Sequence, residues 1–132
     1  MARKFRVGKI DLERADLSCF FNALESKIMR YLWKAGSGTS REIFEAVRPK
    51  GISPVTIAVT LDRLHKRGLV EREVKTGRGG LHYVYRPRLD EKAFGEEISM
   101  RFARSMLAAF GDSVASFFSK EMMRKLLSKR RR

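Results

Sequence analysis

Several kinds of residue are scarce in this 132-residue chain, and each scarcity excludes a class of protein. The single cysteine, Cys19, excludes a disulfide framework within the chain and predicts a reducing, cytoplasmic location. The histidines, His65 and His82, lie too far from Cys19 and from each other to give the ligand spacing of a zinc site. No apolar run is long enough to span a membrane, and residues 1–9 lack the apolar middle of a secretory signal, so we expect neither.

Residue arrangements that support catalysis or cofactor binding are also lacking. No nucleophile is recognisably paired with a base, and Cys19 is expected to be a small core residue. The one glycine-rich stretch, residues 77–80, falls within a predicted hairpin and lacks the Walker pattern of a phosphate-binding loop. The sequence therefore predicts a binding protein, with no enzymatic activity, no cofactor and no metal.

Acidic residues are few relative to basic ones. Asp and Glu number 15 against 29 Lys and Arg, which gives a formal net charge of +14. The excess lies in residues 1–88, which hold 19 bases and nine acids, and in the last four residues, Lys129–Arg132. This distribution is typical of a protein with a polyanionic partner, although a solubilising surface or thermal adaptation also produces it.

The segment 53–68, SPVTIAVTLDRLHKRG, predicts a short helix with clear ends. Ser53 suits the N-cap, Pro54 the first helical position, and Gly68 the left-handed residue beyond the end. Apolar side chains repeat at helical spacing and form a narrow buried stripe: Ile57, Leu61 and Leu64. By itself the segment fits a recognition helix or an ordinary amphipathic surface helix.

Two helices are predicted ahead of this segment, each with a capping box. Asn22 begins the first, with Glu25 three residues later, and Thr39 begins the second, with Glu42 in the same relation. The second helix stops before Pro49.

The N-terminal segment allows more than one structure. Residues 1–9 are a basic arm, which is either a disordered tail or an ordered arm that reaches into a nucleic-acid groove, and Phe5 and Val7 would allow it to pair as an extended edge. Residues 10–21 are either a short helix or a strap packed on the domain. Met29 and Trp33 lie beside the apolar stripe of the first helix, so we expect them to pack against this strap or against a partner chain.

Residues 69–87 predict a β-hairpin, because apolar and aromatic residues alternate on either side of a glycine-rich turn that carries Arg78. Three short helices followed by a two-stranded ribbon are the winged helix-turn-helix plan, in which the third helix enters the major groove of DNA and the hairpin lies along the backbone. We expect one set of residues to read or position bases: Val55, Thr56, Val59, Asp62 and Arg63. A second set is expected to hold phosphates: Arg41, Ser53, Lys66, Arg67 and Arg78. A solvated turn is the alternative for Arg78.

Two further amphipathic helices are predicted from Asp90 onward, separated by Gly111, with Asp112 or Ser113 capping the second. They carry more apolar surface than two helices bury against each other, so they either fold back on the winged domain or pair with a second subunit. Pairing is the preferred alternative, because a two-fold dimer presents two recognition helices to a pseudo-palindromic site. The expected dimerisation residues are Phe94, Ile98, Phe102, Met106, Phe110, Val114, Phe117, Phe118, Met122 and Leu126.

Taken together, these segments resemble the penicillinase-repressor family of winged-helix regulators from about Leu24 to Phe118. The resemblance implies an N-terminal winged helix, a C-terminal helical dimerisation domain, and repression by occupying an operator with two-fold symmetry. It rests on these motifs: Leu32-Trp33, Thr39-Ser40-Arg41-Glu42, Ser53-Pro54-Val55-Thr56, the Leu61–Gly68 helix end, and Tyr85-Arg86-Pro87.

The chain departs from the family pattern in several places. Family members often carry lysines on the third helix where this chain has Val55, Ala58 and Val59, so the family's operator is not carried over; valines suit thymine methyl groups. The wing is longer than the family's usual turn, and both chain ends are basic, so more affinity is expected from phosphates. No cysteine follows Cys19, which excludes the copper-responsive branch with its clustered C-terminal cysteines.

The sequence therefore predicts a mainly helical protein with a small β-hairpin, in three regions. Residues 1–21 are a basic extension, 22–88 a winged helix-turn-helix domain that binds double-stranded DNA, and 89–132 a helical dimerisation region with a basic tail. The predicted function is that of a homodimeric, sequence-specific transcriptional regulator, a repressor at a pseudo-palindromic operator. The alternative is a basic winged-helix protein that binds RNA or a ribonucleoprotein without reading sequence.

Overall fold

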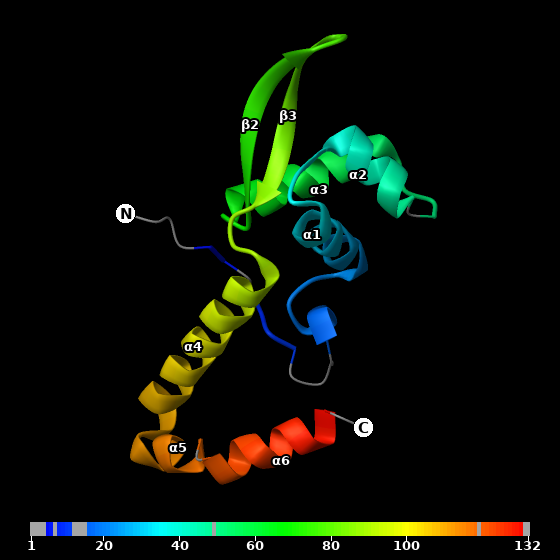
Figure 1. Cartoon of the computed structure of the whole chain (residues 1–132). Coiled ribbons are helices and arrows are strands. Elements are labelled where there is room, and N and C mark those ends of the chain that lie inside the picture. Colours follow the sequence, from blue (N-terminus) through cyan, green and yellow to red (C-terminus); the bar gives the residue numbers. More distant parts are fainter. Residues whose placement is uncertain (1–4, 7, 12–15, 49, 119, 131–132) are drawn as a thin grey trace. The chain divides into compact units, whose positions relative to one another are not determined.

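The structure, a computed structural model, describes residues 5–6, 8–11, 16–48, 50–118 and 120–130. The chain divides into two compact units, Met1–Glu91 and Lys92–Arg132 (Figure 1). Within the described residues, no helix has the length and apolar character needed to cross a membrane.

The first unit contains the predicted helices. A 3-10 turn at Asp16–Cys19 is followed by α1 (Ala23–Ala35), α2 (Ser40–Val47) and α3 (Pro54–Lys66). Both capping boxes are confirmed, because Asn22 and Glu25, and likewise Thr39 and Glu42, exchange side-chain to backbone hydrogen bonds in both directions. The left-handed residue after α3 is also confirmed, since Gly68 has a φ of 78°.

The predicted hairpin is confirmed but belongs to a three-stranded antiparallel sheet. Its strands are β2 (Val70–Gly77) and β3 (Gly80–Pro87), and a short strand β1 (Gly38–Thr39) pairs with the other edge of β3. The sequence predicted the two strands of the hairpin and missed the third strand, β1. The N-cap Thr39 has an extended backbone, with φ −81° and ψ 163°, so the chain entering α2 lies in a conformation that can pair with β3.

Gly38 allows this short strand to lie close to the helices. A Cβ atom at Gly38 would lie 3.0 Å from Cε1 of Tyr31 and 3.4 Å from Cγ1 of Ile43. A larger residue here would require the ring of Tyr31 to shift by a few tenths of an ångström.

The core of the first unit lies between the three helices and the base of the sheet. Its fully buried side chains come from every one of these elements: Ile28, Met29, Leu32, Ile43, Ile57, Leu61, Leu64 and Val70. Met29 and Trp33 need no partner chain, because Met29 is buried and the indole N–H of Trp33 donates to the carbonyl of Leu89 over 3.1 Å.

The described part of the N-terminal segment, residues 5–6, 8–11 and 16–21, is packed on this unit and is called the strap below. Phe5 and Phe21 are buried, and the N–H of Asp11 donates to the carbonyl of Cys19 over 2.9 Å. The alternative of a disordered tail is therefore wrong for Phe5 and Arg6; residues 1–4 and 7 of the expected arm lie outside the described residues.

The second unit is helical, as expected, but with one more break. It comprises α4 (Glu91–Phe110), α5 (Asp112–Phe117) and α6 (Lys120–Arg130). The single helix expected after Gly111 is wrong, because Phe118 leaves the helical conformation with φ −77° and ψ 47°. Gly111, not Asp112 or Ser113, is the N-cap of α5, and the Ser113 hydroxyl donates to the Phe110 carbonyl instead.

Candidate nucleic-acid interface

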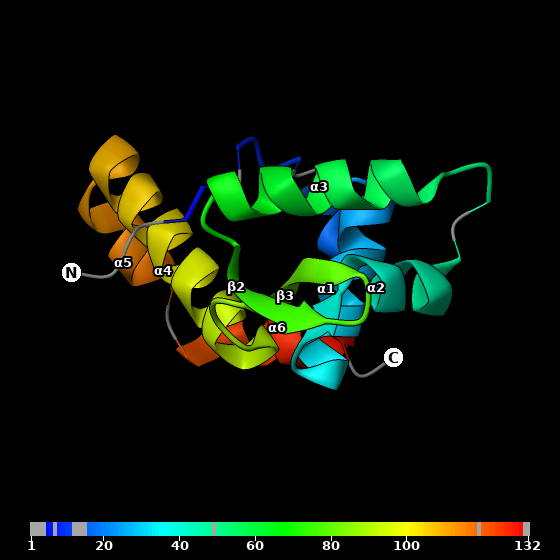
Figure 2. The same cartoon turned by 90° about the horizontal axis from the view of Figure 1, so that it is seen from above.

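Helix α3 presents a free outer face. Its inner side chains Ile57, Leu61 and Leu64 are fully buried, whereas Val55 is 70% exposed and Val59 is 44% exposed. Figure 2 shows α3 along one edge of the first unit. Aliphatic side chains that face outward from a well-anchored helix suit contact with thymine methyl groups in a major groove.

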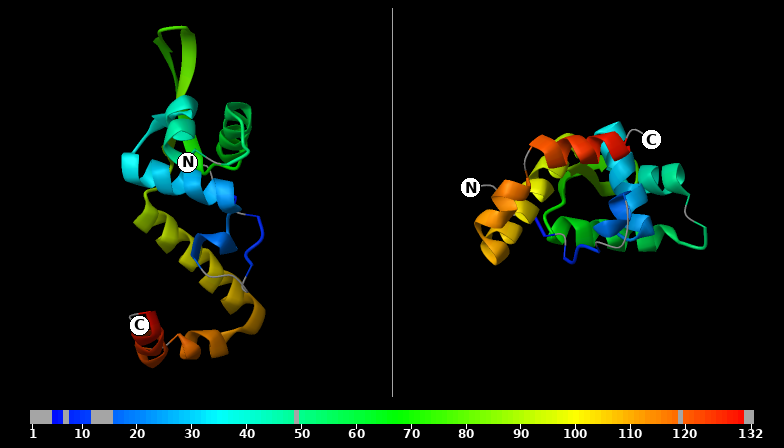
Figure 3. Two further views of the ribbon diagram at one scale, coloured as in Figure 1. Left: turned by 90° about the vertical axis from the view of Figure 1, so that its right-hand side faces the viewer. Right: turned by 90° about the horizontal axis from the view of Figure 1, so that it is seen from below.

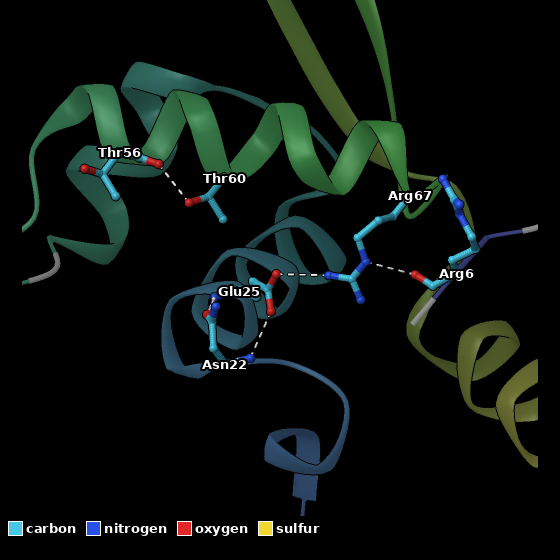
Figure 4. Close-up of polar contacts among 6 residues, drawn as sticks. All are labelled: Arg6, Asn22, Glu25, Thr56, Thr60 and Arg67. Carbon is cyan, nitrogen blue, oxygen red and sulfur yellow. Dashed lines mark hydrogen bonds and ion pairs between the residues drawn. The ribbon is translucent and has the colours of Figure 1, made fainter. Parts of the chain in front are cut away.

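The amino end of α3 is held by its own hydroxyl groups. Oγ of Ser53 accepts the N–H of Thr56 over 3.3 Å, and the two hydroxyls also lie 3.3 Å apart. One turn later, the hydroxyl of buried Thr60 donates to the carbonyl of Thr56 over 2.8 Å (Figure 4). Thr60 was not predicted as a core residue, because its hydroxyl is acceptable there only through this bond to the preceding turn.

The tip of the hairpin carries Arg78 in the predicted place. Gly77 pairs with Gly80, which leaves Arg78 and Gly79 as a two-residue turn, and Gly79 and Gly80 have φ values of 88° and 106°. Such values favour glycine at both positions. Arg78 is exposed and has no ion pair with any residue that the structure describes. Figure 1 shows the turn at the end of a long hairpin that projects away from the helices of the first unit.

Asp62 has a different setting from the one expected for a residue that reads bases. Its Oδ1 lies 2.9 Å from Nη1 of Arg72 on β2, and its Oδ2 lies 3.0 Å from Nζ of Lys66 on the next turn. The hydrogen bonds from Lys66 and from Arg72 hold the pKa of Asp62 below its usual range. The carboxylate is therefore occupied by two cations, and it connects α3 to the base of the hairpin.

Arg72 is the residue of this network that the sequence did not single out. Its guanidinium carbon lies 4.3 Å from the ring centroid of Tyr83, and Tyr83 in turn packs edge-on against Tyr85 at 6.0 Å. The hydrogen bond to Asp62 raises the pKa of Arg72 above its ordinary value. The alternation along β2 gave a signal, because Arg72 stands two residues after buried Val70 and so on the same strand face.

Arg67 also differs from expectation. Its Nη1 donates to Oε2 of Glu25 over 3.0 Å, and its Nε donates to the carbonyl of Arg6 over 3.0 Å (Figure 4). Only 25% of its side chain and 13% of that of Glu25 are exposed. Because this guanidinium is engaged with α1 and with the strap, Arg67 is not a candidate for binding a phosphate.

The remaining candidate cations lie on exposed positions. Arg41 is exposed in the first turn of α2, and Arg63 is exposed on α3 without an ion pair to the described part of the chain. Lys66 is exposed beside Asp62, so its charge is partly balanced. Arg41, Arg63 and Arg78 are thus the candidates whose charge is not balanced by an ion pair within the described part of the chain.

Cys19 and the histidines do not gather into a site. Within the ranges that the structure describes, no three His, Cys, Asp or Glu side chains lie close enough to hold a metal ion. The thiol of Cys19 donates to the carbonyl of Asp16 over 3.0 Å, and burial raises its pKa. Nδ1 of His65 lies 3.3 Å from the carbonyl of Val70.

Comparison with known proteins agrees with this geometry. The model of the penicillinase repressor family matches residues 21–129. The search of curated proteins gave no match.

Solved structures that resemble the chain include the following three. A possible transcriptional regulator from Methanosarcina mazei Go1 has a TM-score of 0.54 at 12% identity, over 75% of this chain and 81% of that one, which shows a shared fold. A PadR family transcription regulator from Clostridium difficile R20291 has a TM-score of 0.47 at 18% identity, over 67% and 98% of the two chains. Stf76 from the Sulfolobus islandicus plasmid-virus pSSVx has a TM-score of 0.44 at 25% identity, over 58% and 95%.

The predicted fold class, a mainly helical winged helix-turn-helix protein with a small β-hairpin and C-terminal helices, is confirmed, with β1 as an additional strand. The family model spans most of the chain, and its match includes the whole of α3, the hairpin, α4 and α5, and α6 as far as residue 129. The chain belongs to the penicillinase repressor family and is a DNA-binding transcriptional regulator.

Proposed function

We propose that the protein is a homodimeric repressor that occupies a pseudo-palindromic operator through two copies of α3. The observation that carries this proposal is the outer face of α3, which is exposed, is anchored by a fully buried inner face, and is tied to the hairpin by Asp62 and Arg72. In a major groove, Val55 and Val59 would contact thymine methyl groups, and Thr56 and Arg63 would reach the hydrogen-bonding edges of bases.

The phosphate contacts are assigned to residues around this helix. Arg78 at the hairpin tip would neutralise the backbone beside the groove, and Arg41 would do so near the amino end of α3, where the hydroxyl of Ser53 would donate a hydrogen bond to a phosphate. Lys66 would contact a phosphate near the carboxyl end of α3. Asp62, which was expected to read bases, is assigned instead to positioning Arg72 and Lys66.

The dimer is assigned to the second unit. Large apolar side chains remain exposed along α4, α5 and α6 in the single chain, and Phe110 and Phe117 are two-thirds exposed. Exposed apolar surface of this kind marks an interaction site, and a closed two-fold pairing of the same helices would cover it. Of the expected dimerisation residues, Phe94 and Ile98 are buried, four are half-buried (Phe102, Met106, Val114 and Met122), and four are exposed: Phe110, Phe117, Phe118 and Leu126.

Mass measurement in solution tests the dimer. Light scattering at micromolar concentration is expected to give twice the mass of one chain, and Leu126→Glu is expected to shift the protein toward a single chain. Leu81→Glu is the matched control, because Leu81 is a more exposed leucine on β3 in the first unit. A wild-type protein that elutes as one chain would contradict the proposal, as would equal effects of the two substitutions.

Binding competition tests the choice of nucleic acid. Repression at an operator requires that duplex DNA be preferred, so structured RNA of equal length and at equal salt is expected to compete poorly for the protein. RNA that competes as well as duplex DNA would favour the alternative of an RNA-binding winged helix.

A further inference from the structure

The N-terminal strap reaches the carboxyl end of α3, although it precedes the part of the chain matched by the family model, which begins at residue 21. Phe5 is 4% exposed, so this end of the strap is anchored by an apolar side chain. The next residue, Arg6, donates its N–H to the carbonyl of Arg67 over 2.7 Å, and Arg67 returns a bond from Nε to the carbonyl of Arg6 over 3.0 Å. The strap backbone at Arg6 is therefore fixed against Arg67, the C-cap residue of α3.

Arg67 is itself held in place, which makes this attachment rigid. Its second donor group binds Oε2 of Glu25, and the other oxygen of Glu25 accepts the N–H of Asn22 at the start of α1 (Figure 4). One carboxylate thus caps α1 and orients the guanidinium that holds the strap. Charge-assisted bonds in a largely buried setting are among the stronger polar contacts of a protein.

The strap carries positive charge on two exposed side chains. Arg6 binds Arg67 through its backbone, whereas its side chain is exposed, and Lys9 is exposed as well. Among the described residues, neither side chain forms an ion pair. The described strap runs away from the carboxyl end of α3 in the direction opposite to the hairpin (Figures 1 and 3).

We propose that Arg6 and Lys9 form a second phosphate-binding edge, which contacts duplex DNA on the side of α3 opposite to the wing. This inference rests on the proposed function, in that α3 is taken to enter the major groove. A groove is bordered by two backbones, and the wing with Arg78 serves one of them. The strap, whose backbone is held at Arg6, supplies cations for the other, and such contacts add affinity that does not depend on sequence.

The test is the salt dependence of binding to a random-sequence duplex, for wild type and for the double variant Arg6→Glu, Lys9→Glu. Each phosphate contact adds about 0.9 to the slope of log affinity against log salt, so the double variant is expected to lose about 1.8. The backbone bonds of Arg6 do not involve its side chain, so the strap should stay docked, and thermal unfolding checks this. Arg6→Gln, Lys9→Gln is the second variant, expected to reduce the slope in the same way with less change in charge.

Lys34→Glu is the matched control for charge. Lys34 is exposed in the last turn of α1, whose carboxyl end lies on the side of the first unit away from α3 (Figures 2 and 3). The control is expected to keep the wild-type slope. If wild type binds the duplex and the strap variants keep its slope, or if Lys34→Glu loses as much per charge as they do, the strap proposal is overturned. If wild type does not bind duplex DNA at all, the proposed function itself fails.

Discussion

Nη1 of Arg72 lies 2.9 Å from Oδ1 of Asp62, and this ion pair joins the hairpin to the helix that we propose enters the major groove. The guanidinium is also packed on the ring of Tyr83 at 4.3 Å, so Arg72 is held from two sides. The direction in which the hairpin leaves the first unit is therefore linked to α3. A wing fixed in this way meets the DNA backbone without first losing conformational freedom, which favours tight binding.

Loss of this link is expected to weaken DNA binding. Arg72→Gln and Asp62→Asn should each lower the affinity for an operator several-fold, and the double variant should be little worse than either, because both remove the same contact. Titration of a labelled duplex measures this. Arg86→Gln is the control, since the ion pair of Arg86 with Glu73 at 2.7 Å lies within the hairpin. Additive losses in the double variant would contradict the positioning role.

The same pair predicts a pH dependence of stability. Hydrogen bonds from Lys66 and then from Arg72 lower the pKa of Asp62, so the folded state binds the proton less readily than the unfolded state. The stabilisation is therefore present above about pH 4, the ordinary range of an aspartate, and is lost as the pH falls through the lowered pKa. Urea unfolding from pH 6 to pH 3 should show wild type more stable than Asp62→Asn at pH 6, with a difference that shrinks below pH 4. A difference that stays constant over this range would argue against the pair.

Residues proposed to read bases and residues proposed to hold phosphates should respond differently to substitution. Arg78→Glu is expected to weaken binding to all duplexes about equally and to lower the salt slope, because it removes a backbone contact. Val59→Ala and Arg63→Ala are expected to change the preference among sequences, at about 1–3 kcal/mol for a lost bidentate base contact and less for a methyl contact. Titrations over several sequences and salt concentrations separate the two patterns. If Arg78→Glu and the α3 variants behaved alike, the assignment of roles would be wrong.

The contact between Arg67 and Glu25 is expected to contribute to stability and not to sequence preference. Arg67→Met should lower the free energy of unfolding by about 1–3 kcal/mol, because the carboxylate of Glu25 is left largely buried without its partner. Glu45→Gln is the control, since the Arg48–Glu45 pair has a similar distance of 3.1 Å but is well exposed, and such pairs contribute about 0–1 kcal/mol. Chemical denaturation measures both. A larger loss from Glu45→Gln would contradict the structural role of Arg67.

The parts of the fold that the sequence predicted are those specified by neighbouring residues. Two helix starts are fixed by contacts between residues three positions apart, Asn22 with Glu25 and Thr39 with Glu42. Gly68 follows α3 at a position that requires a positive φ, which glycine adopts readily. Residues within a few positions of one another are therefore sufficient to predict these features. The hairpin around Arg78 belongs to the same class, since alternation and a glycine turn suffice to predict it.

The parts that the sequence did not predict depend on residues distant in the chain. Arg67 and Asp62 both look like exposed residues of a cationic helix, and only the tertiary structure shows that one meets Glu25 and the other Arg72. The strand β1 is two residues long and carries no alternation. For the same reason the docking of Arg6 was left open, because its partner lies 61 residues away.

Selection of bound fragments from a random-sequence DNA pool is the most direct test of the central claim, that two copies of α3 read a symmetric operator. We expect an enriched motif with a two-fold axis, whose half-sites lie about one helical turn of DNA apart or a multiple of it. Enrichment of a single unrepeated half-site, or no enrichment above the starting pool, would contradict it.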